Sequence, residues 1–449
     1  MGPQYRRLSV AIVATVVFIA FEGMAVATAM PTAVPDLDGL PLYAFAFSGF
    51  FTTSLFAMVV SGEVCDRRGP LLPILMGVAA FTAGLVIAGA AQSMWPFLAG
   101  RAIQGLGAGL IIVALYVVVG RTFPEDMRPR IFAAIAAAWV VPSIVGPLVA
   151  GLLTDHASWR WVFLGIAPLV LIPVALALPT VRTVDGPPPG GSRIRAGRKR
   201  FALATAVGVG MLQYAGSRTD IVSVVLCVLA VALVAPTLPR VLPPGTLLLR
   251  RGLPTVVAMR GILAGAFFGT EAFLPLLLVS ERGLSSTLAG LSLTGGALGW
   301  AAGSWYQGRS STVTPRYLLI RIGAALVAMA ISSVTLVLVP GVPVVVTMLG
   351  WVVGAFGMGM SIASISVVLF ELSPVEDHGA NSAALQVSDA LFAAVFVGLA
   401  GTIFGTGHGA APGEESVPGW IYLVIIAAMT ALALFGSWAA GRVRVPVTR

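Results

Sequence analysis

Long apolar segments dominate this sequence and constrain its fold more than any other feature. A helix needs about 20 predominantly apolar residues to cross the hydrocarbon core of a bilayer. Fourteen segments approach or exceed that length, namely 8–30, 42–62, 71–90, 96–120, 131–152, 160–179, 201–216, 220–236, 254–279, 287–307, 317–339, 343–371, 379–404 and 419–441. Only 10% of the 449 residues are charged, whereas soluble globular proteins have about 25%. We therefore expect an all-α polytopic membrane protein.

The basic residues are distributed unevenly along the chain. The net charge is +9, and Lys199 is the one lysine among 27 basic residues. Most arginines lie in alternate loops between apolar segments, a bias that marks the cytoplasmic side of a membrane protein. Few lie in the other loops, chiefly Arg160, Arg218 and Arg282. We expect both termini in the cytoplasm, a location in the cytoplasmic membrane and no nucleic-acid partner.

The order of the segments suggests a duplicated bundle. Residues 62–69 and 303–309 are Gly-punctuated basic turns at equivalent places in two halves of six segments each. Such duplication is typical of secondary transporters, whose site lies at the midplane between the halves. The expected domains are a six-helix bundle at 1–180, a basic cytoplasmic linker at 181–200, a two-helix insertion with its connecting loop at 201–252, and a second six-helix bundle at 253–449. The short insertion leaves the count at twelve or fourteen spans.

Four segments resemble motifs of one transporter family. Residues 62–69 resemble the loop motif of the major facilitator superfamily, and residues 101–109 resemble its fourth-helix motif, whose arginine is implicated in proton transfer. Residues 142–151 are similar to its fifth-helix antiporter motif. Residues 158–163 resemble the start of helix six in the 14-span drug:proton antiporters. The resemblance implies a gating loop at Gly62, Asp66, Arg67, Gly69 and Arg309, and an antiporter motif at Pro142, Gly146, Pro147 and Gly151.

These motifs also have a direct physical interpretation. Asp66 can form charge-assisted hydrogen bonds that hold adjoining helix ends in one conformational state; the alternative is an ordinary solvated turn. Gly146 and Gly151 let a neighbouring helix approach, while Pro142 and Pro147 bend the fifth helix. General membrane-helix packing would use the same residues.

Charged residues inside the apolar segments are the best functional candidates, because a charge in the bilayer costs at least about 2.5 kcal/mol. Glu22 and Glu271 lie near the middle of the first segment of each half, beside phenylalanines. Apolar surroundings disfavour the charged form of a carboxylate, which suits a proton carrier. Arg101 cannot release its proton, but it can hold a carboxylate; the alternative is that it extends to the surface. Asp389 lies inside the penultimate segment, and no motif assigns it a role.

The candidate residues therefore form two sets. For proton coupling they are Glu22, Arg101, Glu271 and Asp389, and for the substrate cavity Phe18, Phe21, Gln104, Phe267 and Phe268. The three histidines lie in separate loops, so we expect no metal site. The sequence has no phosphate-binding loop, HExxH or GxSxG motif, so we expect that the protein is not an enzyme and uses no cofactor. We expect a proton gradient to drive transport.

The function that these features favour is proton-coupled multidrug efflux, the export of lipophilic compounds, cationic ones included, by a monomeric antiporter that confers antibiotic resistance. Two alternatives stay open: a proton-coupled uptake symporter or facilitator for a small polar solute, and an exporter of an endogenous lipid or metabolite. A membrane scaffold is disfavoured by the costly charges within the spans.

Overall fold

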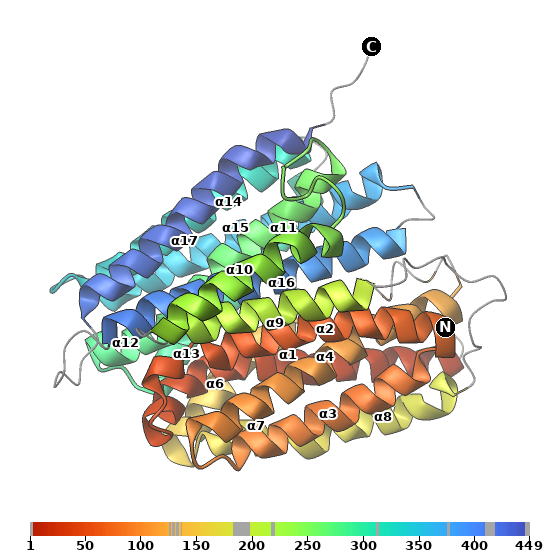
Figure 1. Ribbon diagram of the computed structural model, residues 1–449, viewed down its shortest axis with the longest axis horizontal. Coiled ribbons are helices and arrows are strands. Elements are labelled where there is room, and N and C mark those ends of the chain that lie inside the picture. Colours follow the sequence, from red (N-terminus) through yellow and green to blue (C-terminus); the bar gives the residue numbers. More distant parts are fainter. Residues whose placement is uncertain are drawn as a thin grey trace. The chain divides into compact units, whose positions relative to one another are not determined.

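The computed structural model describes residues 3–182 apart from 125, 126, 128–130, 132, 133 and 136, and then 198–216, 221–310, 314–374, 378–408 and 418–444. All regular structure in these residues is helical (Figure 1). Eleven helical segments are long and apolar enough to cross a membrane, which confirms the predicted all-α polytopic fold. The segments predicted at 131–152, 201–216 and 287–307 are not among the eleven, although their described residues are helical apart from a turn at 138 and 139.

The chain divides into two compact units, residues 1–206 and 207–449. The first unit contains α1 (Pro3–Asp36), η1 (Leu40–Leu42), α2 (Phe45–Arg68), α3 (Leu71–Gly89), α4 (Met94–Thr122), α6 (Val140–His156), α7 (Arg160–Leu164) and α8 (Ile166–Val181). Helix α9 (Arg198–Gly216) begins in the first unit and ends in the second. Residues 183–197, most of the predicted linker, lie outside the described residues.

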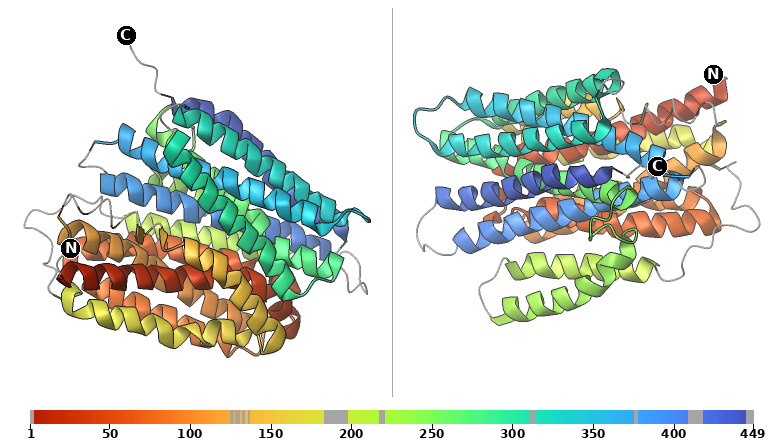
Figure 2. Two further views of the ribbon diagram at one scale, coloured as in Figure 1. Left: turned by 180° about the vertical axis from the view of Figure 1, so that it is seen from behind. Right: turned by 90° about the horizontal axis from the view of Figure 1, so that it is seen from above.

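The second unit continues with α10 (Ile221–Val241), α11 (Leu253–Glu271), α12 (Leu274–Arg282), α13 (Ser286–Ser310), α14 (Arg316–Ser333), η2 (Val334–Leu338), α15 (Val344–Leu372), α16 (His378–His408), α17 (Gly419–Ala439) and η4 (Ala440–Val443). Helices α9 and α10 lie side by side as a hairpin (Figure 2). Whether this hairpin crosses the membrane stays a prediction, as do the predicted domain boundaries. The tight turn predicted at 217–220 lies outside the described residues.

Helix packing follows the same pattern in both units. In the first, α4 packs on α2 and α3, and α1 packs on α6 and α8. In the second, α15 packs on α13 and α14, and α11 packs on α16 and α17. Each helix of one set therefore has a counterpart with equivalent neighbours in the other. This repetition within the units confirms the predicted pair of six-helix bundles.

The two basic turns predicted at 62–69 and 303–309 are mostly helical. Helix α2 continues through Arg68 and ends at Gly69, whose φ of +81° suits glycine. An ion pair of 2.7 Å joins Glu63 to Arg67 one turn apart, and such pairs favour helix. Residues 303–309 lie entirely within α13. Polar residues at the end of a span thus extend the helix instead of beginning a loop.

Candidate functional site

Glycines on α4 allow unusually close contact with two neighbouring helices. A Cβ on Gly105 would lie 2.3 Å from the carbonyl oxygen of Phe50 on α2, and one on Gly107 would lie 2.4 Å from the backbone nitrogen of Phe81 on α3. Thr53 of α2 also donates a 2.8 Å hydrogen bond to the carbonyl of Ala102. Small residues permit this backbone approach in membrane helices, so the position of α4 is closely fixed.

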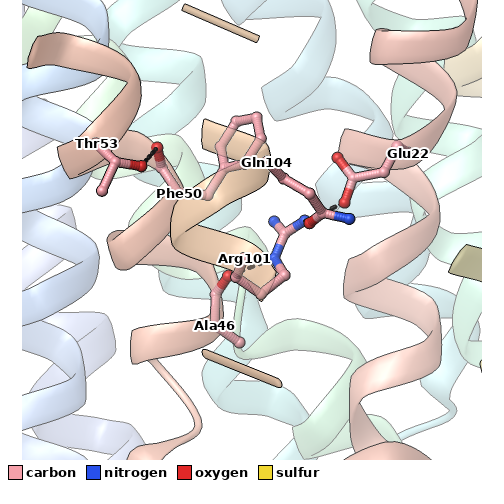
Figure 3. Close-up of polar contacts among 6 residues, drawn as sticks. All are labelled: Glu22, Ala46, Phe50, Thr53, Arg101 and Gln104. Atoms are coloured by element: carbon pink, nitrogen blue, oxygen red, sulfur yellow. Dashed lines mark hydrogen bonds and ion pairs between the residues drawn. The ribbon is translucent and has the colours of Figure 1, made fainter. Parts of the chain in front are cut away.

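Arg101 of α4 lies at the centre of a buried polar cluster (Figure 3). Its Nη1 donates to Glu22 of α1, with which it forms an ion pair, and also to Oε1 of Gln104 at 2.7 Å. Its Nε donates to the carbonyl of Ala46 on α2 at 2.8 Å. The guanidinium carbon also lies 4.8 Å from the centre of the Phe50 ring. Three helices therefore contribute to one charge cluster.

Burial of this cluster decides between the two interpretations of Arg101. Arg101 is 2% exposed and Glu22 is 0% exposed, so the arginine holds a carboxylate and does not extend to the surface. Gln104 accepts a hydrogen bond from the guanidinium, and its predicted place in the substrate cavity stays a prediction. The sequence showed that Arg101 and Gln104 share a helix face, but it did not identify Glu22 as the partner.

Two polar atoms in the cluster lack a hydrogen bond. The Oε2 atom of Glu22 and the Nε2 atom of Gln104 are buried without a partner among the described residues. An unsatisfied buried polar atom costs about 1–3 kcal/mol. Such atoms are rare in native proteins, and functional sites are one place where they occur.

Glu271 has different surroundings from Glu22. It is the last residue of α11, where the span breaks before α12. Pro275 lacks the N–H that would otherwise donate to the Glu271 carbonyl, which explains the break. Glu271 is partly exposed and makes no hydrogen bond or ion pair with a described residue. The second unit therefore presents a carboxylate within a span that has no cationic partner in the part of the chain that the structure describes.

An aromatic cluster lies one turn before Glu271 on α11. Phe267 stacks on Trp351 of α15 with centroids 4.6 Å apart, and its edge meets Trp300 of α13 at 5.6 Å. Phe267 is buried, while Phe268 is partly exposed. Of the predicted cavity residues in this unit, Phe268 is therefore the more accessible. In the first unit Phe18 and Phe21 of α1 are partly exposed.

Asp389 of α16 is paired with an arginine that is not among the candidate residues predicted from the sequence. Arg260 of α11 donates from Nε to Oδ1 of Asp389 at 2.7 Å. The signal was present in the sequence, because Arg260 is a charge inside the predicted span 254–279. Both units thus contain an arginine–carboxylate pair. The pair in the first unit joins α4 to α1 and the pair in the second joins α11 to α16, so the two pairs do not lie on equivalent helices of the repeat.

The gating motif connects the ends of α2 and α4. Asp66 lies 3.9 Å from Nη2 of Arg121, and the same nitrogen donates to the carbonyl of Cys65 at 3.2 Å. Lys199 of α9 lies 3.3 Å from Glu63. In the second unit the guanidinium of Arg309 lies over the ring of Trp305. Asp66 at the end of α2 thus forms an ion pair with a residue at the end of α4, and its role in gating stays a prediction.

The antiporter motif lies on α6 and faces α1. Pro142, Gly146, Pro147 and Gly151 are all buried. A Cβ on Gly146 would lie 3.5 Å from both Met24 and the Phe21 carbonyl. These residues flank Glu22 in the chain, so α6 covers the segment of α1 that carries the buried carboxylate. The 3.5 Å distance is an ordinary contact, which is much looser than the contact at Gly105.

A family model described as Major Facilitator Superfamily matches residues 11–397. The chain belongs to this superfamily. Its members are transporters rather than enzymes, which agrees with the absence of hydrolase motifs in the sequence. Among the described residues, no group of histidine, cysteine, aspartate and glutamate could hold a metal ion.

Curated relatives in the superfamily share modest identity with the chain. An uncharacterized MFS-type transporter of Mycobacterium tuberculosis is 28% identical over 410 residues, covering 87% of this chain and 57% of the relative. The chain therefore spans little more than half the length of that relative. The multidrug transporter protein MdtP of Bacillus subtilis is 29% identical over 175 residues, which is 38% of this chain and 32% of MdtP.

Solved structures of other transporters show the same fold. The POT family transporter PepTSo has a TM-score of 0.69 at 12% identity, with 97% of both chains covered. A mutant form of the nucleoside transporter NupG has a TM-score of 0.66 at 12% identity, with 96% of this chain and 99% of NupG covered. These similarities agree with the packing of the two units.

Proposed function

We propose that this superfamily member is a proton-coupled antiporter that exports lipophilic compounds, cationic ones included. The observation that carries the proposal is the contrast between two carboxylates within the spans. Glu22 is ion-paired with Arg101, whereas Glu271 has no cationic partner among the described residues. The two glutamates are therefore suited to different tasks.

Glu271 is the exchangeable proton site in this proposal. Taking up a proton breaks no ion pair or hydrogen bond between Glu271 and a described residue. Protonation of Glu22 would instead weaken its ion pair and leave the buried Arg101 charge without compensation, which is costly. Arg101 thus favours the ionised form of Glu22, while Glu271 gains and loses the transported proton.

The same carboxylate also explains a preference for lipophilic cations. An uncompensated carboxylate attracts cations most strongly where water is scarce. The ring of Phe268 offers a partly exposed aromatic face one turn away. The relatives named multidrug transporters, including MdtP of Bacillus subtilis, support such a substrate class.

Coupling follows if proton and substrate compete for Glu271. A proton arriving from outside neutralises the carboxylate and favours return to the inward-facing state. A cation arriving from the cytoplasm displaces the proton and favours export. A ligand shifts such an equilibrium only through its differential affinity for the two states. Contacts such as Asp66 with Arg121 supply part of that difference. The proton gradient is the energy source, and no cofactor takes part.

The proposal includes a location in the cytoplasmic membrane, with both termini in the cytoplasm and a monomeric carrier. It is tested by reconstituting the protein in proteoliposomes and measuring ethidium movement under an imposed pH gradient. Ethidium should move against the proton flow, and Glu271→Gln should abolish uphill movement. Glu281→Gln, an exposed carboxylate on the same span, is the matched control and should retain it. Movement of ethidium with the protons would overturn the proposal in favour of a symporter.

A further inference from the structure

One face of α11 remains open within the second unit. Between residues 255 and 272 only Arg260, Phe268 and Glu271 are not buried. Arg260 and Glu271 are eleven residues apart, so they differ by only about 20° around the helix and by about 16 Å along it. Phe268 lies between Arg260 and Glu271 along the helix axis. The open face therefore has a guanidinium near one end, a carboxylate near the other, and an aromatic ring between.

Asp389 occupies only one edge of the Arg260 guanidinium. The single hydrogen bond runs from Nε to Oδ1, and neither side chain has another hydrogen bond to a described residue. Arg260 keeps 17% of its side-chain surface exposed and Asp389 keeps 22%. Guanidinium has five N–H donors in a rigid planar fork. The two terminal nitrogens of Arg260 are therefore available to a ligand.

The backbone around this pair is closely fixed. Ser388, next to Asp389, donates a 2.8 Å hydrogen bond to the carbonyl of Val257 on α11. Gly261, next to Arg260, allows the close approach, because a Cβ there would lie 2.6 Å from the Ser388 hydroxyl. The pair is thus held on two packed helices, and Asp389 orients the arginine through its Nε, while the terminal nitrogens donate no hydrogen bond to a described residue.

We propose that Arg260 is an anion-binding subsite that takes the carboxylate, sulfonate or phosphate group of an amphiphilic molecule. The planar fork of arginine matches such oxyanions with two parallel hydrogen bonds. The apolar body of the ligand lies along the open face, against Phe268. This inference rests on the proposed function, because it extends the class of transported compounds from lipophilic cations to anionic amphiphiles. Asp389 is a positioning residue in this arrangement.

The test compares two fluorescent probes with the same apolar body, the anion pyrenebutyrate and the cation pyrenebutyltrimethylammonium. Equilibrium binding is measured in nanodiscs of zwitterionic lipid without a proton gradient. Arg260→Met should weaken anion binding about 10- to 100-fold, the equivalent of one or two charge-assisted hydrogen bonds, and leave cation binding nearly unchanged. Arg321→Met, which removes an exposed arginine of α14, is the matched control and should change neither affinity.

Variants of Asp389 separate ligand binding from helix packing. Asp389→Asn keeps an acceptor for the Arg260 Nε but removes a negative charge beside the subsite, so anion affinity should rise several-fold. The double variant Arg260→Gln with Asp389→Asn leaves no unpaired charge, and anion binding should remain lost in a folded protein. Equal losses for both probes in Arg260→Met, or weaker anion binding in Asp389→Asn, would overturn the proposal.

A further experiment identifies whether the anion that binds at Arg260 is a lipid headgroup or a transported molecule. Adding phosphatidylglycerol to the nanodiscs tests whether a lipid headgroup competes with pyrenebutyrate. Competition that depends on Arg260 would mean that a membrane lipid occupies the same subsite, and lack of competition would favour a transported amphiphile. Because binding is measured without a gradient, failure of proton-driven export would leave this result unaffected. Selective dependence of the anion on Arg260 would still support the subsite.

Discussion

The interaction between Glu22 and Arg101 can be measured by a double-mutant cycle. Arg101→Met removes the hydrogen bonds to Glu22, Gln104 and the Ala46 carbonyl, and it leaves a fully buried carboxylate without its cation. Breaking a buried pair in this way costs about 3–5 kcal/mol. Glu22→Gln keeps the side-chain shape but leaves the buried Arg101 charge unpaired, which also costs about 3–5 kcal/mol.

The double variant should be less damaged than the sum of the single variants. With both charges removed, neither side chain leaves an unpaired ion in the interior. We expect an interaction free energy of about 2 kcal/mol or more, as for buried groups in one network. The free energy of unfolding can be measured by titration with a denaturing detergent in mixed micelles, with tryptophan fluorescence as the signal.

The pair between Glu63 and Arg67 provides a matched control for this cycle. It joins the same residue types one turn apart, but the Arg67 side chain is 66% exposed and Glu63 also lies 3.3 Å from Lys199. Exposed pairs of this kind contribute about 0.3–0.5 kcal/mol. If the effects of the Glu22 and Arg101 substitutions on the free energy of unfolding also add to within about 0.5 kcal/mol, the view that burial makes the two residues one charge cluster is refuted.

The other predictions concern packing, the hairpin and topology. Gly105→Ala should destabilise the protein by about 1–3 kcal/mol through overpacking, since the new Cβ would lie 2.3 Å from a backbone oxygen. Gly146→Ala adds only 3.5 Å contacts and should be tolerated. Thermal unfolding in detergent compares the two variants, and equal losses of stability would contradict the packing argument. Deletion of 201–236 with the linker rejoined should leave some transport in a folded protein, and its complete loss in a correctly inserted variant would make the hairpin part of the mechanism. A reporter fused after Arg200 should be cytoplasmic and one fused after Asp155 external; reversed labelling would contradict the topology.

The sequence was sufficient for the helices and for the repeat. Long apolar segments have few alternatives to helix in a membrane, because every backbone polar group must be satisfied within the segment. The predicted span 254–279 corresponds to one apolar helical segment, Leu253–Arg282, which has a break in its helix after Glu271. Pro275 four residues later was a local signal of that break.

The partners of the charged residues could not be predicted in the same way. Arg101 and Glu22 are 79 positions apart in the chain, and helix periodicity gives the face of a residue but not the helix it meets. Arg260 and Asp389 are 129 positions apart, so neither member indicates the other. The same limit explains why Gly105, in tight contact, and Gly146, in loose contact, look alike in sequence.

Substrate-induced proton release from the purified protein tests the central assignment most directly. Ethidium added to weakly buffered wild-type protein should release protons, which a pH-sensitive dye detects. Glu271→Gln should abolish this release, because its side chain has no exchangeable carboxyl proton. Glu22→Gln should retain it, since the ion pair with Arg101 favours the ionised form of the native Glu22. Undiminished release from Glu271→Gln would contradict the account and place the transported proton on another residue.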